Sequence, residues 1–252
     1  MNTFGKYYSK YYDLFYKEKD YKGEAHYINE LIKKFSPINC KTLLDIGCGT
    51  GKHLKFFKEL GYSVSGIDLS QDMIDEAKKN LSQNKGLFCC NSNDFNLNSK
   101  YDVIISLFHV MNYIIKNEDL EKTFKNISLH LSKGGIFIFD FWYGPAVLSD
   151  KPSVKIKRLE DNSIKVTRIT EPEFIENENI VDVNFEVIIE DKKTLSVEKI
   201  YETHEMRYLF LPEIEQFLDI ANLKVIDFFQ WLSLEKKLSF DSWYGVLVIG
   251  SK

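Results

Sequence analysis

The fold is decided by residues 42–54, which read Thr42-Leu43-Leu44-Asp45-Ile46-Gly47-Cys48-Gly49-Thr50-Gly51-Lys52-His53-Leu54. The apolar residues at the start of this stretch are typical of a short buried strand. Three glycines with the spacing G-x-G-x-G follow, and a helical pattern of apolar residues begins at Leu54. Glycine lacks a Cβ and tolerates positive φ, so such a turn lets the backbone pass close to a ligand. The start of the helix adds unpaired N–H groups, and the stretch therefore predicts a ligand site.

The glycine spacing and one acidic residue narrow the class of ligand. A dinucleotide site has the spacing G-x-G-x-x-G, with the pyrophosphate at the helix start. Here Gly51 comes one residue early, and Asp45 stands at the end of the strand. A carboxylate there would repel a pyrophosphate but would suit S-adenosylmethionine, which carries an ammonium, a sulfonium and no phosphate. The pattern L-L-D-I-G-C-G-T-G resembles the first motif of the class I methyltransferases.

The composition predicts one large globular domain, or one domain with an insertion. Of the 252 residues, 44% are hydrophobic and 28% are charged, so a sizeable core is available. The net charge of −4 argues against a protein that binds nucleic acid by electrostatic attraction. Four cysteines without a C-x-x-C pair predict neither a metal site nor a disulfide. Without a signal segment or a membrane-spanning run, we expect a soluble, cytoplasmic protein.

Beyond the glycine turn, strands and helices alternate as they do in a doubly wound α/β sheet. Further strands are expected at residues 63–68, 87–91, 101–108, 136–139, 225–229 and 243–250. The nearly unbroken apolar run at 101–108 is typical of a parallel strand that helices cover on both faces. A helix is expected from Leu120 to Leu131, ended by the glycines Gly134 and Gly135. His130 falls in its last turn, where a structural role is expected.

Between residues 151 and 205 the apolar pattern changes to a period of two. Alternating runs at 163–169, 181–187 and 197–201 predict an antiparallel β meander with one solvent-exposed face. Inserted after the fifth strand, it would either cap the acceptor pocket or form a dimer contact. The predicted organisation is a helical lid at 1–35, a cofactor-binding domain at 36–150 and 206–252, and the insertion at 151–205.

Acidic residues at later strand ends are candidates for binding the rest of the cofactor. Asp68 ends the second strand, at the distance beyond the glycine turn where an acidic residue meets a ribose diol. Met73, on the next helix, is expected to lie against the adenine face. Asp94, with Phe95 beside it, is expected to accept a hydrogen bond from the adenine amino group, or else to be a turn residue.

Polar side chains at the ends of the fourth and fifth strands are candidates for the reaction itself. Ligands of open α/β sheets bind at the carboxyl ends of the strands. His109 and Tyr113 follow the fourth strand and Asp140 ends the fifth. We expect His109 to be either a general base or part of the pocket wall. Asp140 would orient the ammonium group of an amine acceptor.

Taken together, these motifs make the chain resemble the class I S-adenosylmethionine-dependent methyltransferases. The matching residues are Asp45 with the three glycines, then Asp68, and then residues 93–95. A narrower resemblance, carried by residues 12–16, 19–21, 49–54 and the β insertion, is to the N,N-dimethyltransferases of nucleotide-linked amino-deoxysugars. It implies that Tyr16 and Tyr21 close over the cofactor and bind its carboxylate, and that the insertion helps to form a homodimer. Residues 108–113 and 140–143 do not closely repeat that family's residues.

The resemblance implies S-adenosyl-L-methionine as cofactor, S-adenosyl-L-homocysteine as product and a nucleotide-linked amino sugar as acceptor. The residues expected to contact the cofactor are Tyr16, Tyr21, Asp45, Gly47, Gly49, Gly51, His53, Asp68, Leu69, Met73, Asn93, Asp94, Phe95 and Leu107. The residues expected to face the acceptor are His109, Tyr113 and Asp140.

Three alternatives stay open at this point. An O-methyltransferase acting on a sugar or another surface-polysaccharide precursor would share every cofactor residue and would need a better base. A nucleotide-dependent dehydrogenase is disfavoured by the glycine spacing. A non-catalytic module could have kept the fold. A nucleic-acid methyltransferase is disfavoured because the chain lacks basic stripes and an N-P-P-Y-type motif.

Overall fold

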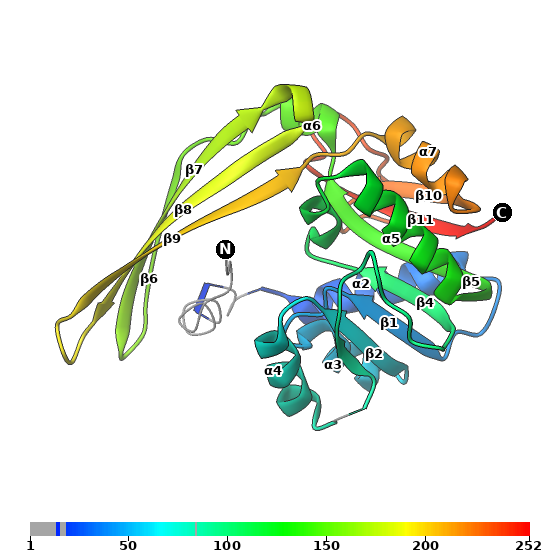
Figure 1. The fold of residues 1–252 in the computed structure, drawn as a ribbon, viewed down its shortest axis with the longest axis horizontal. Coiled ribbons are helices and arrows are strands. Elements are labelled where there is room, and N and C mark those ends of the chain that lie inside the picture. Colours follow the sequence, from blue (N-terminus) through cyan, green and yellow to red (C-terminus); the bar gives the residue numbers. More distant parts are fainter. Residues whose placement is uncertain (1–13, 16–18, 84) are drawn as a thin grey trace. The chain divides into compact units, whose positions relative to one another are not determined.

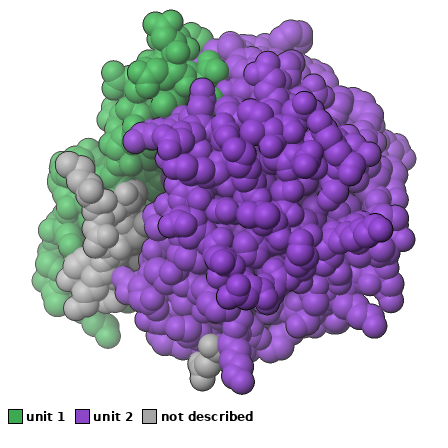
Figure 2. Space-filling model, turned by 45° about the vertical axis from the view of Figure 1, so that its right-hand side comes forward, with its two compact units in different colours: residues 1–19, 150–207 green, residues 20–149, 208–252 purple. Residues whose placement is uncertain are grey.

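A computed structural model describes residues 14–15, 19–83 and 85–252 of the chain. The chain divides into two compact units, drawn in two colours in Figure 2. One unit comprises residues 20–149 and 208–252, and the other comprises residues 150–207 with the N-terminal segment up to residue 19. Tyr16, one of the predicted cofactor residues, lies outside the described residues.

The larger unit is built on a seven-stranded sheet with the strand order β10-β11-β5-β4-β1-β2-β3 (Figure 1). Its strands are β1 (Thr42–Ile46), β2 (Ser63–Asp68), β3 (Leu87–Cys89), β4 (Tyr101–Ser106), β5 (Leu131–Trp142), β10 (Leu223–Gln230) and β11 (Tyr244–Ser251). β1 to β5 run parallel, whereas β11 pairs antiparallel with both β5 and β10. This arrangement confirms the predicted doubly wound α/β fold with an antiparallel strand pair at its end.

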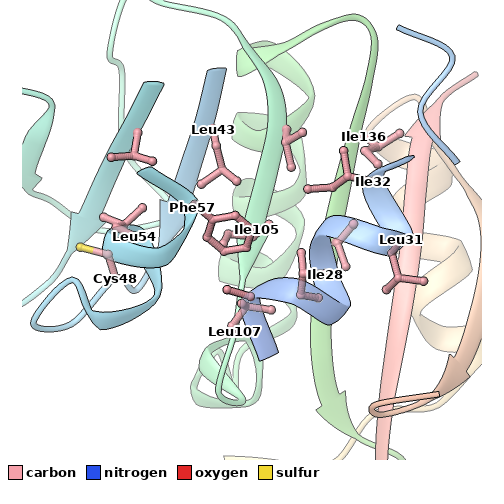
Figure 3. Packing of buried hydrophobic residues seen from close by; sticks show 14 of the residues in the cluster. Ile28, Leu31, Ile32, Leu43, Cys48, Leu54, Phe57, Ile105, Leu107 and Ile136 are labelled. Atoms are coloured by element: carbon pink, nitrogen blue, oxygen red, sulfur yellow. The ribbon is translucent and has the colours of Figure 1, made fainter. Parts of the chain in front are cut away.

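Helices cover both faces of this sheet. The helices and short helical turns of the unit are α2 (Tyr21–Phe35), α3 (Lys52–Glu59), α4 (Gln71–Leu81), η1 (Val110–Tyr113), α5 (Asn117–His130), α6 (Gly144–Ser149) and α7 (Leu211–Ile220). One buried cluster joins residues of α2, α3 and α4 to Leu43, and part of it appears in Figure 3. The second cluster joins α5 and α7 to Leu44. Successive strand residues point to opposite faces, which explains why these strands read as continuous apolar runs.

The end of α5 differs from the prediction. The helix stops at His130, and Leu131 already belongs to β5, where it pairs with Tyr101. Gly134 has a φ of 79°, but it lies inside the irregular start of the strand and does not cap the helix. The predicted glycine cap is therefore wrong, because the buried side chain of Leu131 draws the backbone into the sheet. His130 has the expected structural role, since its Nε2 accepts from the Leu97 N–H at 3.0 Å.

The smaller unit is an antiparallel sheet with the strand order β6-β7-β8-β9. Its elements are β6 (Lys155–Glu160), β7 (Ile164–Ile175), η2 (Glu176–Glu178), β8 (Ile180–Asp191) and β9 (Val197–Arg207). The inserted antiparallel sheet is thus confirmed, whereas β6 was not predicted, because charged residues interrupt its alternation. Phe15 is buried in this unit, with the Arg168 guanidinium 4.4 Å from its ring centre. A role of the sheet as cap or dimer contact stays a prediction.

Candidate cofactor and acceptor site

The glycine turn between β1 and α3 is folded back onto β2. The backbone N–H groups of Gly47 and Cys48 donate to the carbonyl oxygen of Ile67 at 2.8 and 2.9 Å. Gly47 has a φ of 76°, and a Cβ added to it would lie 2.6 Å from both methyl groups of Val110. A side chain at position 47 is therefore excluded by both backbone conformation and packing. Directly after β1, position 47 therefore presents backbone alone.

Asp45 is a buried carboxylate without a full set of partners. Its side chain lies at the end of β1 with a residue exposure of 1%. Its Oδ1 atom is buried and has no hydrogen-bond partner within the part of the chain that the structure describes. Burial, together with the nearby carboxylates of Asp68 and Asp140, raises the pKa of Asp45 well above its ordinary value. A buried, unpaired acid of this kind needs a donor or a positive charge.

Asp68, at the end of β2, joins the glycine turn to the start of α4. Its Oδ2 accepts from the Gly49 N–H at 2.8 Å and its Oδ1 from the Ser70 N–H at 2.9 Å. Burial raises the pKa of Asp68, and the hydrogen bonds from these backbone groups lower it in part. Each carboxylate oxygen has a second acceptor position. The side chain is therefore held in place while it can still accept from two adjacent hydroxyl groups.

The N-terminal turn of α2 borders the same glycine turn. His53 Nε2 lies 2.7 Å from the Glu24 carboxylate, and both side chains are buried. The ring of Tyr21 meets the edge of His53 at a centroid distance of 4.9 Å, and the Lys52 Nζ lies 5.4 Å from the Tyr21 ring centre. The structure thus brings Tyr21 and His53 together, as a common site requires. Lys52 and Glu24 were missed, since a helical lysine and glutamate carry no signal of their own in the sequence.

The predicted residues Leu69, Met73 and Leu107 differ in exposure. Leu69 follows Asp68 and is 70% exposed. Met73 is half-buried on α4, where its N–H donates to the Ser70 side chain that caps the helix. Leu107 is 2% exposed and belongs to the buried cluster that contains Leu43. Leu69 therefore presents an apolar surface to solvent beside Asp68, while Leu107 packs inside.

The segment 93–95 is arranged differently from the expectation. Asn93 donates from its Nδ2 to Asp119 at 2.8 Å, and Asp94 is exposed. Phe95 is 4% exposed and packs on the ring of His130 at a centroid distance of 4.4 Å. The ring of Phe95 is thus directed into the core, because α5 supplies an aromatic partner that the local sequence does not reveal. Of these three residues, only Asp94 is exposed to solvent.

His109 and Asp140 form a close pair at the ends of β4 and β5. His109 Nδ1 lies 2.7 Å from the Asp140 Oδ2, although off the line of a regular hydrogen bond. The backbone N–H of His109 also approaches both carboxylate oxygens, at 3.1 and 3.2 Å. Beside an ionised Asp140 carboxylate at this distance, the proton of the neutral ring is favoured on Nδ1, which leaves Nε2 as the nitrogen that can accept a proton.

The backbone around His109 is strained. Phe108 and His109 have φ values of 68° and 62°, two consecutive left-handed residues that are not glycine. Strain of this kind persists only where the surroundings impose it, and it is concentrated at functional sites. Here Asp140 holds the main chain and the ring of His109 at once. The Asp140 carboxylate is 1% exposed and contacts His109. It was expected to contact an acceptor amine instead.

Tyr113 ends η1 with a residue exposure of 45%. Asn112, which precedes it, is buried, and its side-chain oxygen accepts from the Trp142 N–H at 3.2 Å. This bond ties η1 to β5 and was not anticipated. Across the described ranges, no group of acidic, histidine and cysteine side chains is arranged to bind a metal ion, and no helix is both long and apolar enough for a membrane span.

Several known methyltransferases are similar to this chain. Residues 43–135 match a family model described as a methyltransferase domain. A dTDP-3-amino-3,4,6-trideoxy-alpha-D-glucopyranose N,N-dimethyltransferase of Streptomyces venezuelae is 36% identical over 142 residues. The match covers 55% of this chain and 59% of that relative, so the chain spans little more than half the length of this relative.

Two solved structures resemble nearly the whole chain. A S-adenosylmethionine-dependent methyltransferase from Clostridium acetobutylicum has a TM-score of 0.82 and 27% identity, with 97% of each chain covered. DesVI of Streptomyces venezuelae has a TM-score of 0.81 and 24% identity, with 97% of this chain and 98% of that chain covered. The second likeness shows the fold alone.

Proposed function

We propose that this chain, which matches a methyltransferase domain over residues 43–135, is a class I S-adenosylmethionine-dependent methyltransferase that transfers a methyl group to an amino group of a nucleotide-linked amino sugar. The observation that supports the cofactor most directly is the buried carboxylate of Asp45, which has an unpartnered oxygen beside a glycine turn. A phosphate would be repelled there, whereas an ammonium or sulfonium would be attracted. The amino-sugar acceptor is supported by the name of the relative from Streptomyces venezuelae.

The residues present fit S-adenosylmethionine. Asp45 would hold its positive charge, Asp68 its ribose hydroxyls, and the glycine turn would approach its chain closely. Tyr21 and Lys52, whose side chains lie close together, would offer a hydroxyl and a cation to its carboxylate group. When bound, the cofactor supplies a methyl group on a positively charged sulfur. Tyr16, outside the described residues, completes the proposed set.

The chain's own residues would then orient the acceptor and take its proton. Displacement at a sulfonium needs little more than an aligned nucleophile and the exclusion of water. An amine must first lose a proton if it is held as an ammonium. His109 Nε2 would accept this proton, while Asp140, 2.7 Å from Nδ1, would balance the charge that the ring gains. Tyr113, exposed at the end of η1, would bond the polar part of the acceptor.

A sugar hydroxyl is the second candidate acceptor. The His109–Asp140 pair favours it, because a hydroxyl needs a base more than a neutral amine does. The product would then be an O-methylated sugar or another precursor of a surface polysaccharide.

We further propose a cytoplasmic homodimer whose contact includes the inserted sheet. This is supported by Ile156, Val197 and Tyr201, which expose 53%, 60% and 70% of their surfaces on that sheet. Equilibrium sedimentation of the full chain, compared with a variant in which all three residues are replaced by serine, tests it. A monomeric wild-type protein at micromolar concentration would refute it.

The reaction is tested with radiolabelled S-adenosylmethionine and a panel of nucleotide-linked sugars that differ only in amino or hydroxyl groups. We expect label in the amino sugars. Label only in the hydroxy sugars would replace the first candidate by the second. A protein that binds the cofactor and labels neither set would contradict both, and one that does not bind the cofactor would contradict the whole proposal.

A further inference from the structure

Four aromatic rings form a cluster where β5 ends and β11 begins, and each ring contacts two of the others. The ring of His109 stacks on Tyr244 with a centroid distance of 4.5 Å and an interplanar angle of 18°. Tyr244 meets Trp243 at 5.7 Å, Trp243 meets Trp142 at 5.1 Å, and Trp142 meets His109 at 6.3 Å. The last three contacts are edge-to-face, so only Tyr244 lies flat against the histidine.

Strand pairing fixes the position of Tyr244. Tyr244 pairs with Trp142 in the antiparallel ladder of β11 and β5. Its carbonyl oxygen accepts from the Trp231 N–H at 2.9 Å, and the preceding carbonyl, of Trp243, accepts from the Tyr143 N–H at 3.1 Å. The backbone of Tyr244 is thus held from two sides. The residue is 41% exposed, so its ring covers His109 at an edge of the sheet that solvent reaches.

His109 is therefore restrained from two directions. Asp140 holds its Nδ1 side and its backbone N–H, and Tyr244 holds the flat face of its ring. We infer that Tyr244 is a positioning residue, which keeps the His109 ring in the orientation that presents Nε2 to the acceptor. This inference rests on the proposed function and adds a residue to it that neither the sequence motifs nor the comparisons assign.

The proposed proton transfer to His109 explains why an aromatic ring is stacked on the histidine. As the nitrogen of the acceptor forms a bond to the methyl carbon, the carbon–sulfur bond breaks and its electron pair stays on sulfur. The proton of the acceptor passes to His109 Nε2, so the ring becomes an imidazolium that later returns the proton to solvent. An imidazolium stacked on Tyr244 and facing Asp140 is stabilised by both, because a cation is attracted to the face of an aromatic ring.

The test compares Tyr244→Leu, which removes the ring, with Tyr244→Phe, which keeps it. Phe240→Leu is the matched control, since Phe240 is an exposed aromatic residue of the loop before β11. Each full-length variant is measured for S-adenosylmethionine affinity by calorimetry and for kcat and KM with the labelled acceptor. The ¹⁵N and ¹H signals of the His109 ring are recorded as well, assigned by their loss in His109→Asn.

We expect Tyr244→Leu to lower kcat by about 10- to 100-fold, because the ring of the base is no longer held in place. Cofactor affinity should stay within about twofold of wild type, and the His109 ring signals should shift and broaden as a second orientation or tautomer is populated. Tyr244→Phe and Phe240→Leu should match wild type in all three measurements.

Three results would overturn the inference. The first is a Tyr244→Leu variant with wild-type kcat, and the second is a loss of kcat without any change in the ring signals. The third is an equal loss in the Phe and Leu variants, which would assign the effect to the hydroxyl group. If the wild-type protein transfers no methyl group at all, the proposed function fails, but the His109 signals of Tyr244→Leu still decide whether the stack orients the ring.

Discussion

Replacing Asp45 by Asn should make the cofactor-free protein more stable while it weakens cofactor binding. The two residues have nearly the same shape, but Asn cannot ionise. Asp45 is buried, one of its oxygens has no partner in the described chain, and two carboxylates lie near it. An unsatisfied buried polar group costs about 1–3 kcal/mol and a charged one costs more, so Asn keeps the first cost and removes only the extra cost of the charge. We therefore expect a gain of about 2 kcal/mol, or roughly 4–8 °C in Tm for a chain of this size.

The sign of the pH dependence follows from the direction of the pKa shift. The pKa of Asp45 is raised in the folded protein, so below the ordinary carboxyl value of about 4 both the folded and the unfolded state hold the proton. Above that value the unfolded state releases its proton first, and the wild-type protein loses stability as the pH rises toward the raised pKa. The advantage of Asp45→Asn should thus be absent near pH 4 and complete at alkaline pH.

Thermal or urea unfolding of the cofactor-free proteins between pH 4 and pH 8 measures this effect, with Asp241→Asn, an exposed position, as control. The same variant should bind S-adenosylmethionine roughly 10- to 150-fold more weakly, because a hydrogen bond to a charged group contributes about 1.5–3 kcal/mol. An Asn variant less stable than wild type at pH 8, with unchanged cofactor affinity, would refute the reasoning on both counts.

Three further predictions concern the same edge of the sheet. Asp68→Ala should lower cofactor affinity at least about 100-fold without loss of the far-ultraviolet circular dichroism, since two ribose hydrogen bonds disappear; normal binding would remove the ribose assignment. In the wild-type protein, cofactor affinity should fall as the pH falls through the raised pKa of Asp45, because a proton on the carboxyl group competes with the positively charged cofactor. Calorimetry in buffers of different ionisation enthalpy should show that binding releases a proton. Binding without proton release would contradict this prediction. His109→Asn should lower kcat by about 10²- to 10⁴-fold with unchanged cofactor affinity if the ring acts as base; a smaller loss would leave His109 a wall of the pocket.

Local patterns were sufficient to predict the parts of the site that depend on single strand ends. The apolar run before Asp45, the glycine turn and Asp68 lie within 27 positions of the chain, and strand and turn signals place them without knowledge of distant residues. Parallel strands end at one edge, so the carboxylates had to come together there. The inserted sheet was predictable for the same reason, because its period-two alternation is local.

The remaining features depend on contacts between distant segments. Phe95 was expected near the cofactor, but its ring packs in the core on His130, a residue of α5 that lies 35 positions further along the chain. The pairing of His109 with Asp140 requires two successive left-handed residues, which no pattern at Phe108 signals. Tyr244 reaches His109 only through the register of β11 on β5, more than a hundred positions along the chain. Each of these depends on tertiary packing that overrides local preference.

The strand order explains why the two halves of the proposed site meet. The order in which successive strands are added to the sheet reverses between β1 and β4. These two strands are neighbours in the sheet, although β2 and β3 lie between them in the sequence. Ligands of open α/β sheets bind at such a switch point, because the loops on its two sides diverge. Here the proposed cofactor residues end β1 and β2, and the proposed acceptor residues follow β4 and β5. The two sets touch where Gly47 leaves no room for a Cβ beside Val110, and Ser106 donates to the Ile46 carbonyl oxygen at 3.0 Å. A methyl group passed from one set to the other would therefore cross the boundary between β1 and β4, next to Gly47 and the first residue of η1.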